Sequence, residues 1–239
     1  MKPPAPLVSL VDDPLPERQF RALHRAIVSL GRERIVAGYQ TTFWFDFARP
    51  PSNLVEQAVL TLRERIPSRL RRGVTGVEWW LSRMRTSNVK VDFHRDRDNA
   101  RFDETGEETH PQLGSVLYLN ACRGGLLAVT EEEPNPANPA CAPDVLDLDV
   151  LAPRANRYCW FRGDLPHGVL DARNQIPGAR LPTERAWRLA IAINYWRERP
   201  WGVPTFDEAP HYRKLALATA RRGSRTSRPG AGRPTRRGT

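Results

Sequence analysis

Between residues 76 and 196 the side chains alternate between apolar and polar, and this alternation limits the fold more than any other feature. Successive side chains of a β-strand point to opposite faces, so each alternating run predicts a strand. Eight strands are predicted, at residues 77–85, 89–93, 115–120, 125–130, 145–151, 157–162, 168–171 and 188–196. So many short strands, separated by polar or turn-like stretches, predict a mainly β domain of the sandwich or jelly-roll type.

The first 75 residues have a different pattern. Residues 16–35 and 53–66 predict helices, and the aromatic-rich run 40–47 predicts a strand. Ser52 or Asn53 is the expected N-cap of the second helix, directly after two prolines. We therefore expect three parts: helical and strand support in 1–75, the β core in 76–200, and a C-terminal extension in 201–239 that ends in a disordered basic tail.

The composition is that of a soluble protein, with 239 residues, 40% hydrophobic and 27% charged. No stretch approaches the length of about 18 apolar residues that a membrane helix needs. The first residues lack a sustained apolar core and soon become acidic, so no secretory signal and a cytoplasmic location are expected. The three cysteines show no Cys-x-x-Cys spacing, so neither a disulfide framework nor a zinc ribbon is predicted.

The net charge of +10 raises the question of a nucleic-acid partner. Residues 211–239 carry nine basic residues and no acid, so the rest of the chain has a net charge near +1. We therefore expect at most weak binding of polyanions through this tail and no membrane partner. The sequence predicts no particular oligomeric state.

His94 and Asp96 end a β-type run, Val-Lys-Val-Asp-Phe-His-Arg-Asp, and its alternation places both on one face. With a second His, an imidazole and a carboxylate form a facial triad that suits non-haem Fe(II) and leaves positions open for substrate and O2. His-Arg-Asp also occurs in kinases, where an Asn follows four residues later. Arg101 stands there and no glycine-rich loop is present, which excludes a kinase; a charged surface loop remains the alternative.

His167 is the best candidate for the second His, because it lies where a turn after an aromatic run leads into a short strand. A ring at such a place can point into the mouth of a barrel. The alternative is a His that only satisfies hydrogen bonds of the turn. The remaining histidines, His24, His110 and His211, have weaker contexts.

The run 188–196 predicts an anion site. One face carries Leu, Ile, Ile and Tyr, and the other carries Arg188, two alanines, Asn194 and Trp196. An arginine beside two methyl-sized side chains leaves room for a small carboxylate, which a guanidinium can bind through two parallel hydrogen bonds. The alternative is an edge arginine that reaches solvent. Arg173, Arg180 and Arg185 compete for the role, but the alternation and the alanines favour Arg188.

Together these features resemble the Fe(II)/2-oxoglutarate-dependent dioxygenase superfamily, and most closely its prolyl-4-hydroxylase-like members. The matching segments are His94-Arg95-Asp96, residues 114–120 (Gly-Ser-Val-Leu-Tyr-Leu-Asn), the glycine-led 124–129, residues 163–169 with His167, and Arg188. The resemblance covers about half of the chain, residues 77–196. Two positions depart from it: prolyl hydroxylases have Lys where Arg188 stands, and the Ser often found two residues later is Ala190.

The resemblance implies a double-stranded β-helix (jelly-roll, cupin-like) core with flanking helices. It implies Fe(II) bound by His94, Asp96 and His167, with 2-oxoglutarate and O2 as co-substrates, and a salt bridge from Arg188 to 2-oxoglutarate. Arg85, Tyr118 and Asn120 are further candidates for binding the co-substrate, and no catalytic residue beyond the metal ligands is expected. The implied reaction is hydroxylation of a C–H bond with release of succinate and CO2, with desaturation and cyclisation as alternatives.

The substrate implied is a small molecule, an amino acid or a peptide. The predicted mouth loops are acidic, which favours a cationic substrate group, with a solvated acidic rim as the alternative; these acids are Asp103, Glu104, Glu107, Glu108 and Glu131 to Glu133. The competing function is a non-enzymatic jelly-roll binding module whose basic tail binds polyanions. Only that module would lose its binding when the residues after Tyr212 are removed.

Overall fold

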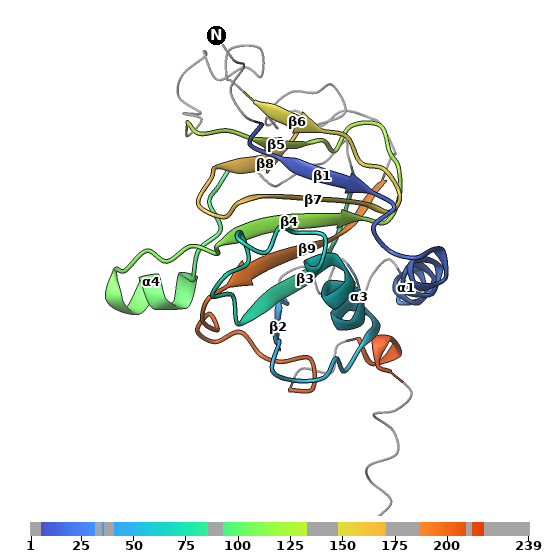
Figure 1. The fold of residues 1–239 in the computed structure, drawn as a ribbon, viewed down its shortest axis with the longest axis horizontal. Helices are drawn as coiled ribbons and strands as arrows, with labels where there is room; N and C mark the ends of the chain where they lie inside the picture. Colours follow the sequence, from blue (N-terminus) through green and yellow to red (C-terminus); the bar gives the residue numbers. More distant parts are fainter. Residues whose placement is uncertain are drawn as a thin grey trace, which may run out of the picture.

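Two antiparallel β-sheets form the core of the computed structural model, which describes residues 6–31, 35, 41–85, 93–132, 148–170, 187–208 and 212–217 (Figure 1). The larger sheet has the strand order β1-β7-β4-β9-β3-β2 and the smaller one has the order β6-β5-β8. The strands of the larger sheet are β1 (Ser9–Asp12), β7 (Arg157–Arg162), β4 (Leu113–Tyr118), β9 (Trp187–Trp196), β3 (Gly76–Arg85) and β2 (Phe43–Asp46). Those of the smaller sheet are β6 (Asp149–Leu151), β5 (Leu127–Val129) and β8 (His167–Val169).

The chain passes repeatedly from one sheet to the other. After β3 in the larger sheet, His94 forms a β-bridge with His167 of β8 in the smaller one. The chain then returns to the larger sheet with β4 and crosses to the smaller sheet for β5 and β6. Strand β7 lies in the larger sheet, β8 in the smaller sheet and β9 again in the larger sheet. This alternation makes the core a double-stranded β-helix, so the predicted fold class is confirmed.

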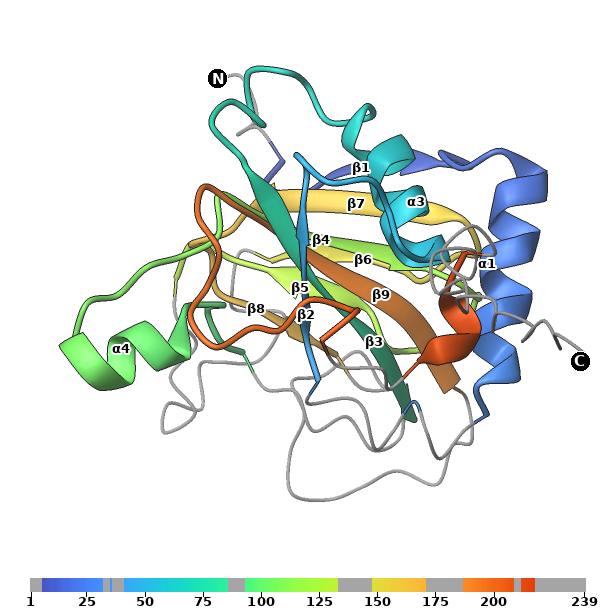
Figure 2. The same cartoon turned by 90° about the horizontal axis from the view of Figure 1, so that it is seen from below.

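Helices α1 (Glu17–Ser29) and α3 (Leu54–Arg63) cover one face of the larger sheet (Figure 2). The apolar residues of this face, among them Trp79, Ile191 and Tyr195, pack with the helices in the main hydrophobic core. Asn53 caps α3, as predicted, by accepting hydrogen bonds from the backbone N–H groups of Val55 and Glu56, each at 3.0 Å. The other face of the larger sheet packs on the smaller sheet and encloses a separate, smaller cluster of apolar residues.

Several predicted elements differ from the observed ones. The first helix was predicted to extend to residue 35, but α1 ends at Ser29, shortly before Gly31 with its φ of 82°. The predicted loop at residues 97–111 contains the helix α4 (Asn99–Thr105). Strand β1 was not predicted, and the extension beyond residue 200 includes the 3-10 helix η1 (Arg213–Leu215).

Some predictions concern residues outside the described part of the chain. They are the strand at 89–93 except for its last residue, the loop at 175–185, and the basic tail beyond residue 217. Within the described residues, β1 and β2 come from the N-terminal segment and join the larger sheet. Among the described helices, none has the length and apolar character needed to cross a bilayer.

Candidate metal centre

His94, Asp96 and His167 converge at the mouth of the double-stranded β-helix. Their nearest ligand atoms all lie within 4.8 Å of one another, and no other group of this kind occurs among the described residues. The two histidines come from distant parts of the sequence, and paired backbone hydrogen bonds of 3.0 and 2.9 Å hold them side by side. The sheet pairing therefore builds the cluster.

Three side chains surround the carboxylate of Asp96. Its Oδ1 lies 3.2 Å from His94 Nε2, and its Oδ2 lies 3.4 Å from His167 Nε2. Asn194 donates a hydrogen bond of 2.9 Å from Nδ2 to the same Oδ2. Burial by itself would raise the pKa of Asp96, but hydrogen bonds from His167 and His94 outweigh it and hold the pKa well below its ordinary value. The carboxylate is thus ionised at neutral pH, as a metal ligand must be.

The ring of His167 is held in one orientation. Its Nδ1 lies 3.1 Å from the carbonyl oxygen of Leu165, and since a carbonyl only accepts, this nitrogen carries the proton. Nε2 faces Asp96 Oδ2, and a metal bound there would take the place of the proton that Nε2 shares with this carboxylate. The ring of Phe161 packs at 4.8 Å between centroids. The ring of His167 thus makes a turn hydrogen bond through Nδ1 and also faces Asp96 through Nε2.

The cluster opens into a cavity with about 540 Å³ of empty volume, part of it open to solvent. One wall is the face of β9 that carries Arg188, Ala190, Ala192 and Asn194, as the alternation of the sequence predicted. The opposite side includes residues of the smaller sheet, among them Leu127 and Val169. The metal ligands and Arg188 thus line the same cavity.

Arg188 is a buried cation without a carboxylate partner. It is 4% exposed, which excludes the alternative of an edge arginine in solvent. Its guanidinium lies 5.1 Å above the ring of Tyr118 and donates one long hydrogen bond of 3.4 Å to Ser82 Oγ. Its Nε has no hydrogen-bond partner, and it takes part in none of the ion pairs of the described residues. Because an unpaired buried charge is costly, this cavity is suited to bind an anion.

Of the other predicted co-substrate residues, Tyr118 and Asn120 lie near Arg188 and are not among the described residues that line the cavity. Tyr118 is fully buried below the guanidinium, and its hydroxyl has no hydrogen-bond partner among the described residues. Burial raises the pKa of this hydroxyl far above its ordinary value, so it stays protonated. Asn120 bonds to the backbone of Trp187 and Leu189, each at 2.8 Å, and so fixes the strand on both sides of Arg188. Arg85 pairs through its backbone with Trp187, and its side chain is outside the described part.

The histidines with weaker contexts do not join the cluster. His110 bonds through Nδ1 to the backbone oxygen of Asp96 at 2.8 Å and so supports the loop that carries the carboxylate. His24 lies on α1, and His211 is outside the described residues. Asn194 and Ser82 were not predicted as site residues. The alternation marked Asn194 as sharing a face with Arg188, but nothing in the sequence showed its bond to Asp96.

No protein-family model and no curated protein matches the chain. Among solved structures, it is similar to a Pseudomonas putida prolyl-4-hydroxylase, with 21% identity, a TM-score of 0.47, and coverage of 82% of this chain and 90% of that one. It is also similar to HygX from Streptomyces hygroscopicus with nickel and 2-oxoglutarate bound (15% identity, TM-score 0.49, 84% and 83% covered). A third is AviO1 from Streptomyces viridochromogenes Tue57 (16% identity, TM-score 0.47, 83% and 93% covered).

All three TM-scores are below 0.5 and all identities are below 25%. Likeness at this level transfers neither activity nor substrate, so we derive the function from the residues of the cavity.

Proposed function

We propose that the protein is an Fe(II)- and 2-oxoglutarate-dependent oxygenase that hydroxylates a C–H bond of a small-molecule, amino-acid or peptidyl substrate. The observation that carries this proposal is the pairing, in one cavity, of a His-Asp-His cluster with a buried arginine that lacks an anionic partner. Neither feature alone has this specificity, because metal clusters and buried arginines each serve many functions.

The residues of the cluster fit a ferrous ion. Two imidazoles and one carboxylate form the ligand set of non-haem Fe(II) sites and leave coordination positions free. His94, Asp96 and His167 would hold the metal, while Asn194 and the carbonyl of Leu165 keep the carboxylate and the second imidazole in place. When bound, Fe(II) and 2-oxoglutarate would supply, together with O2, the oxidising chemistry that hydroxylates the substrate and releases succinate and CO2.

The residues around Arg188 fit a dicarboxylate. A guanidinium can hold a carboxylate through two parallel hydrogen bonds, and the free Nε of Arg188 is one such donor. Ala190 and Ala192 leave the space between this arginine and Asn194 open, so one carboxylate of the ligand would bind Arg188 while its other end reaches the cluster.

The test is an anaerobic titration of Fe(II) into metal-free protein with 2-oxoglutarate present, followed by the weak visible charge-transfer band that such complexes give. Wild type should develop the band, and both His94→Ala and Arg188→Ala should lose it. Arg188→Ala should still bind Fe(II) alone, because Arg188 is not a ligand, whereas His94→Ala should bind it weakly.

Two substitutions serve as matched controls. His24→Ala removes a histidine from α1, far from the cluster, and Arg197→Ala removes an exposed arginine just beyond β9 that bonds to Gln112. Both should keep the band. If folded wild-type protein gives no band at saturating Fe(II) and 2-oxoglutarate, the proposed function is wrong.

A further inference from the structure

A second cavity adjoins the metal centre. It has about 930 Å³ of empty volume, part of it open to solvent, and its lining includes Thr42, Glu78, Arg97, Asp98 and Trp201; we refer to it as the Glu78 cavity. Glu78 of β3 stands opposite Asn194 of β9, the residue that holds Asp96. Arg97 and Asp98 directly follow Asp96 in the chain. The cavity is therefore lined by residues that neighbour Asp96 in the chain or neighbour Asn194 in the sheet.

Glu78 is a partly buried acid of this cavity and has no partner of opposite charge. Among the described residues it takes part in no ion pair, and its carboxylate is hydrogen-bonded to the side chain of Thr42. Burial raises the pKa of Glu78 to about 7, and the nearby Asp96 adds to this effect. A cation bound beside Glu78 would remove the cost of leaving this carboxylate unpaired.

The other charges of the cavity are already used. Asp98 accepts backbone hydrogen bonds from Arg101 at 3.0 Å and from Trp201 at 2.9 Å. Arg97 donates to Asn99 and lies 3.7 Å above the ring of Phe102. Glu78 therefore dominates what the cavity offers to a charged ligand.

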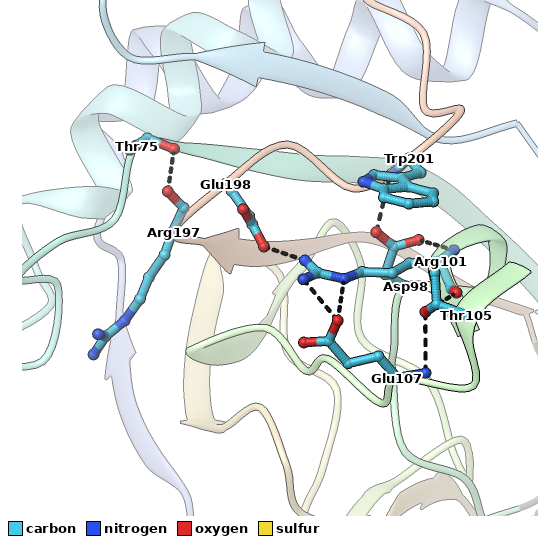
Figure 3. A network of polar contacts seen from close by, with 8 residues as sticks. All are labelled: Thr75, Asp98, Arg101, Thr105, Glu107, Arg197, Glu198 and Trp201. Atoms are coloured by element: carbon cyan, nitrogen blue, oxygen red, sulfur yellow. Dashed lines mark hydrogen bonds and ion pairs between the residues drawn. The ribbon is translucent and has the colours of Figure 1, made fainter.

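Trp201 gives the cavity a flat wall that the fold holds in place (Figure 3). Its backbone is bound to Asp98, the N-cap of α4, and Arg101 of α4 forms ion pairs with Glu107 and with Glu198. Trp201 as a whole residue is 43% exposed, which is unusual for a residue with so large an apolar side chain. Such a surface suits the carbon skeleton of a ligand whose charged end reaches Glu78.

We propose that the Glu78 cavity holds the substrate, and that the substrate carries an ammonium or guanidinium group that pairs with Glu78. This inference rests on the proposed function, since it takes the adjoining cluster as the site of the reaction. The sequence analysis attributed the attraction of a cationic substrate to the acids of the mouth loops, whereas this proposal attributes it to Glu78. Two of the mouth acids are occupied, because Glu107 pairs with Arg101, and Glu108 lies 3.9 Å from Arg97.

The experiment uses anaerobic protein loaded with Fe(II) and 2-oxoglutarate, so that a bound substrate cannot react. The charge-transfer band is recorded first and tests the proposed function by itself. Binding is then measured by calorimetry with two pairs of probes, L-arginine against L-citrulline and L-lysine against L-norleucine. In wild type the cationic member of at least one pair should bind about tenfold more tightly, as expected for a hydrogen bond between charged groups.

Glu78→Gln keeps the shape of the side chain and should abolish this preference while leaving the band unchanged. The matched control is Asp103→Asn, which removes an exposed acid of α4 outside the cavity and should keep the preference. The proposal is overturned if neither pair shows a preference, if Asp103→Asn also loses it, or if Glu78→Gln loses the band, because Glu78 would then serve the metal. A missing band in wild type would instead refute the proposed function, and the probe pairs would still report whether Glu78 selects cations.

Discussion

Replacing Arg188 by Met separates a binding role of this arginine from a structural one. Met is unbranched, apolar and adaptable in shape, so it can occupy the space of the arginine side chain without charge. In the ligand-free protein the guanidinium has a free Nε, one long hydrogen bond to Ser82 and the ring of Tyr118 below it. If this residue exists to bind a ligand, removing its charge should not weaken the fold.

The magnitude follows from these contacts. A buried polar group without a partner costs about 1–3 kcal/mol, and a partly desolvated cation–π contact returns about 0.5–2 kcal/mol. We therefore expect Arg188→Met to change the free energy of unfolding by an amount between about 1 kcal/mol destabilising and about 2.5 kcal/mol stabilising, centred on a slight stabilisation. For a domain of this size, each 1 kcal/mol shifts Tm by about 2–4 °C. An arginine in a structural ion pair would instead cost about 3–5 kcal/mol on removal.

The assay is thermal unfolding with Zn(II) in place of Fe(II), which avoids oxidation, with and without 2-oxoglutarate. A ligand at about 100 times its Kd stabilises the folded state by about 2.7 kcal/mol, so wild type should gain about 5–10 °C. Arg188→Met should show no such gain, and the control Arg197→Met should behave like wild type. If Arg188→Met unfolds much earlier than wild type yet keeps the gain from 2-oxoglutarate, the guanidinium is structural and our interpretation of it is wrong.

Three further predictions concern the cavities and the buried thiol. Ala192→Leu should fill the wall between Arg188 and Asn194 and weaken 2-oxoglutarate binding about tenfold, and unchanged affinity by calorimetry would contradict the position assigned to this ligand. Burial raises the pKa of Glu78 from 4.5 to about 7, so ionisation costs stability as the pH rises through this window and costs nothing below it. Glu78→Gln should therefore gain about 2–3 kcal/mol over wild type between pH 5 and pH 8 in urea unfolding, and parallel pH profiles would refute this. Burial also raises the pKa of the Cys159 thiol to about 12, so iodoacetamide at about pH 8 should label it only after unfolding, as read by mass spectrometry.

The long central strands could be predicted from the sequence because each buries one complete face. The predicted strand 157–162 coincides with β7, and the predicted 188–196 differs from β9 by one residue. Helix α4 was missed because it has no apolar face; its stability comes from the cap at Asp98 and the left-handed Gly106 at its end. Strand β1 was missed because it lies at an edge, pairs only with β7 and leaves Leu10 47% exposed.

The parts of the candidate site that could be predicted are those in which the residues lie close together in the sequence. The spacing of His94 and Asp96 puts them on one face, and the alternation of β9 puts Arg188 beside the alanines. Asn120 was assigned to the co-substrate, although its hydrogen bonds are to the backbone on both sides of Arg188. Glu78 was not predicted as a site residue. The positions of Asn120 and Glu78 depend on the pairing register of strands that are distant in the sequence, and a single sequence does not specify this register.

Strand β9 connects the stability of the protein to its proposed chemistry. It lies between β4 and β3, with Ile191, Ile193 and Tyr195 in the main core and Arg188 and Asn194 in the cavity. A shift of its pairing by one residue would exchange the two faces and bury a charged and an amide side chain against the helices. The register that fills the core is therefore the same one that aligns Arg188 with the space before the cluster and Asn194 with Asp96.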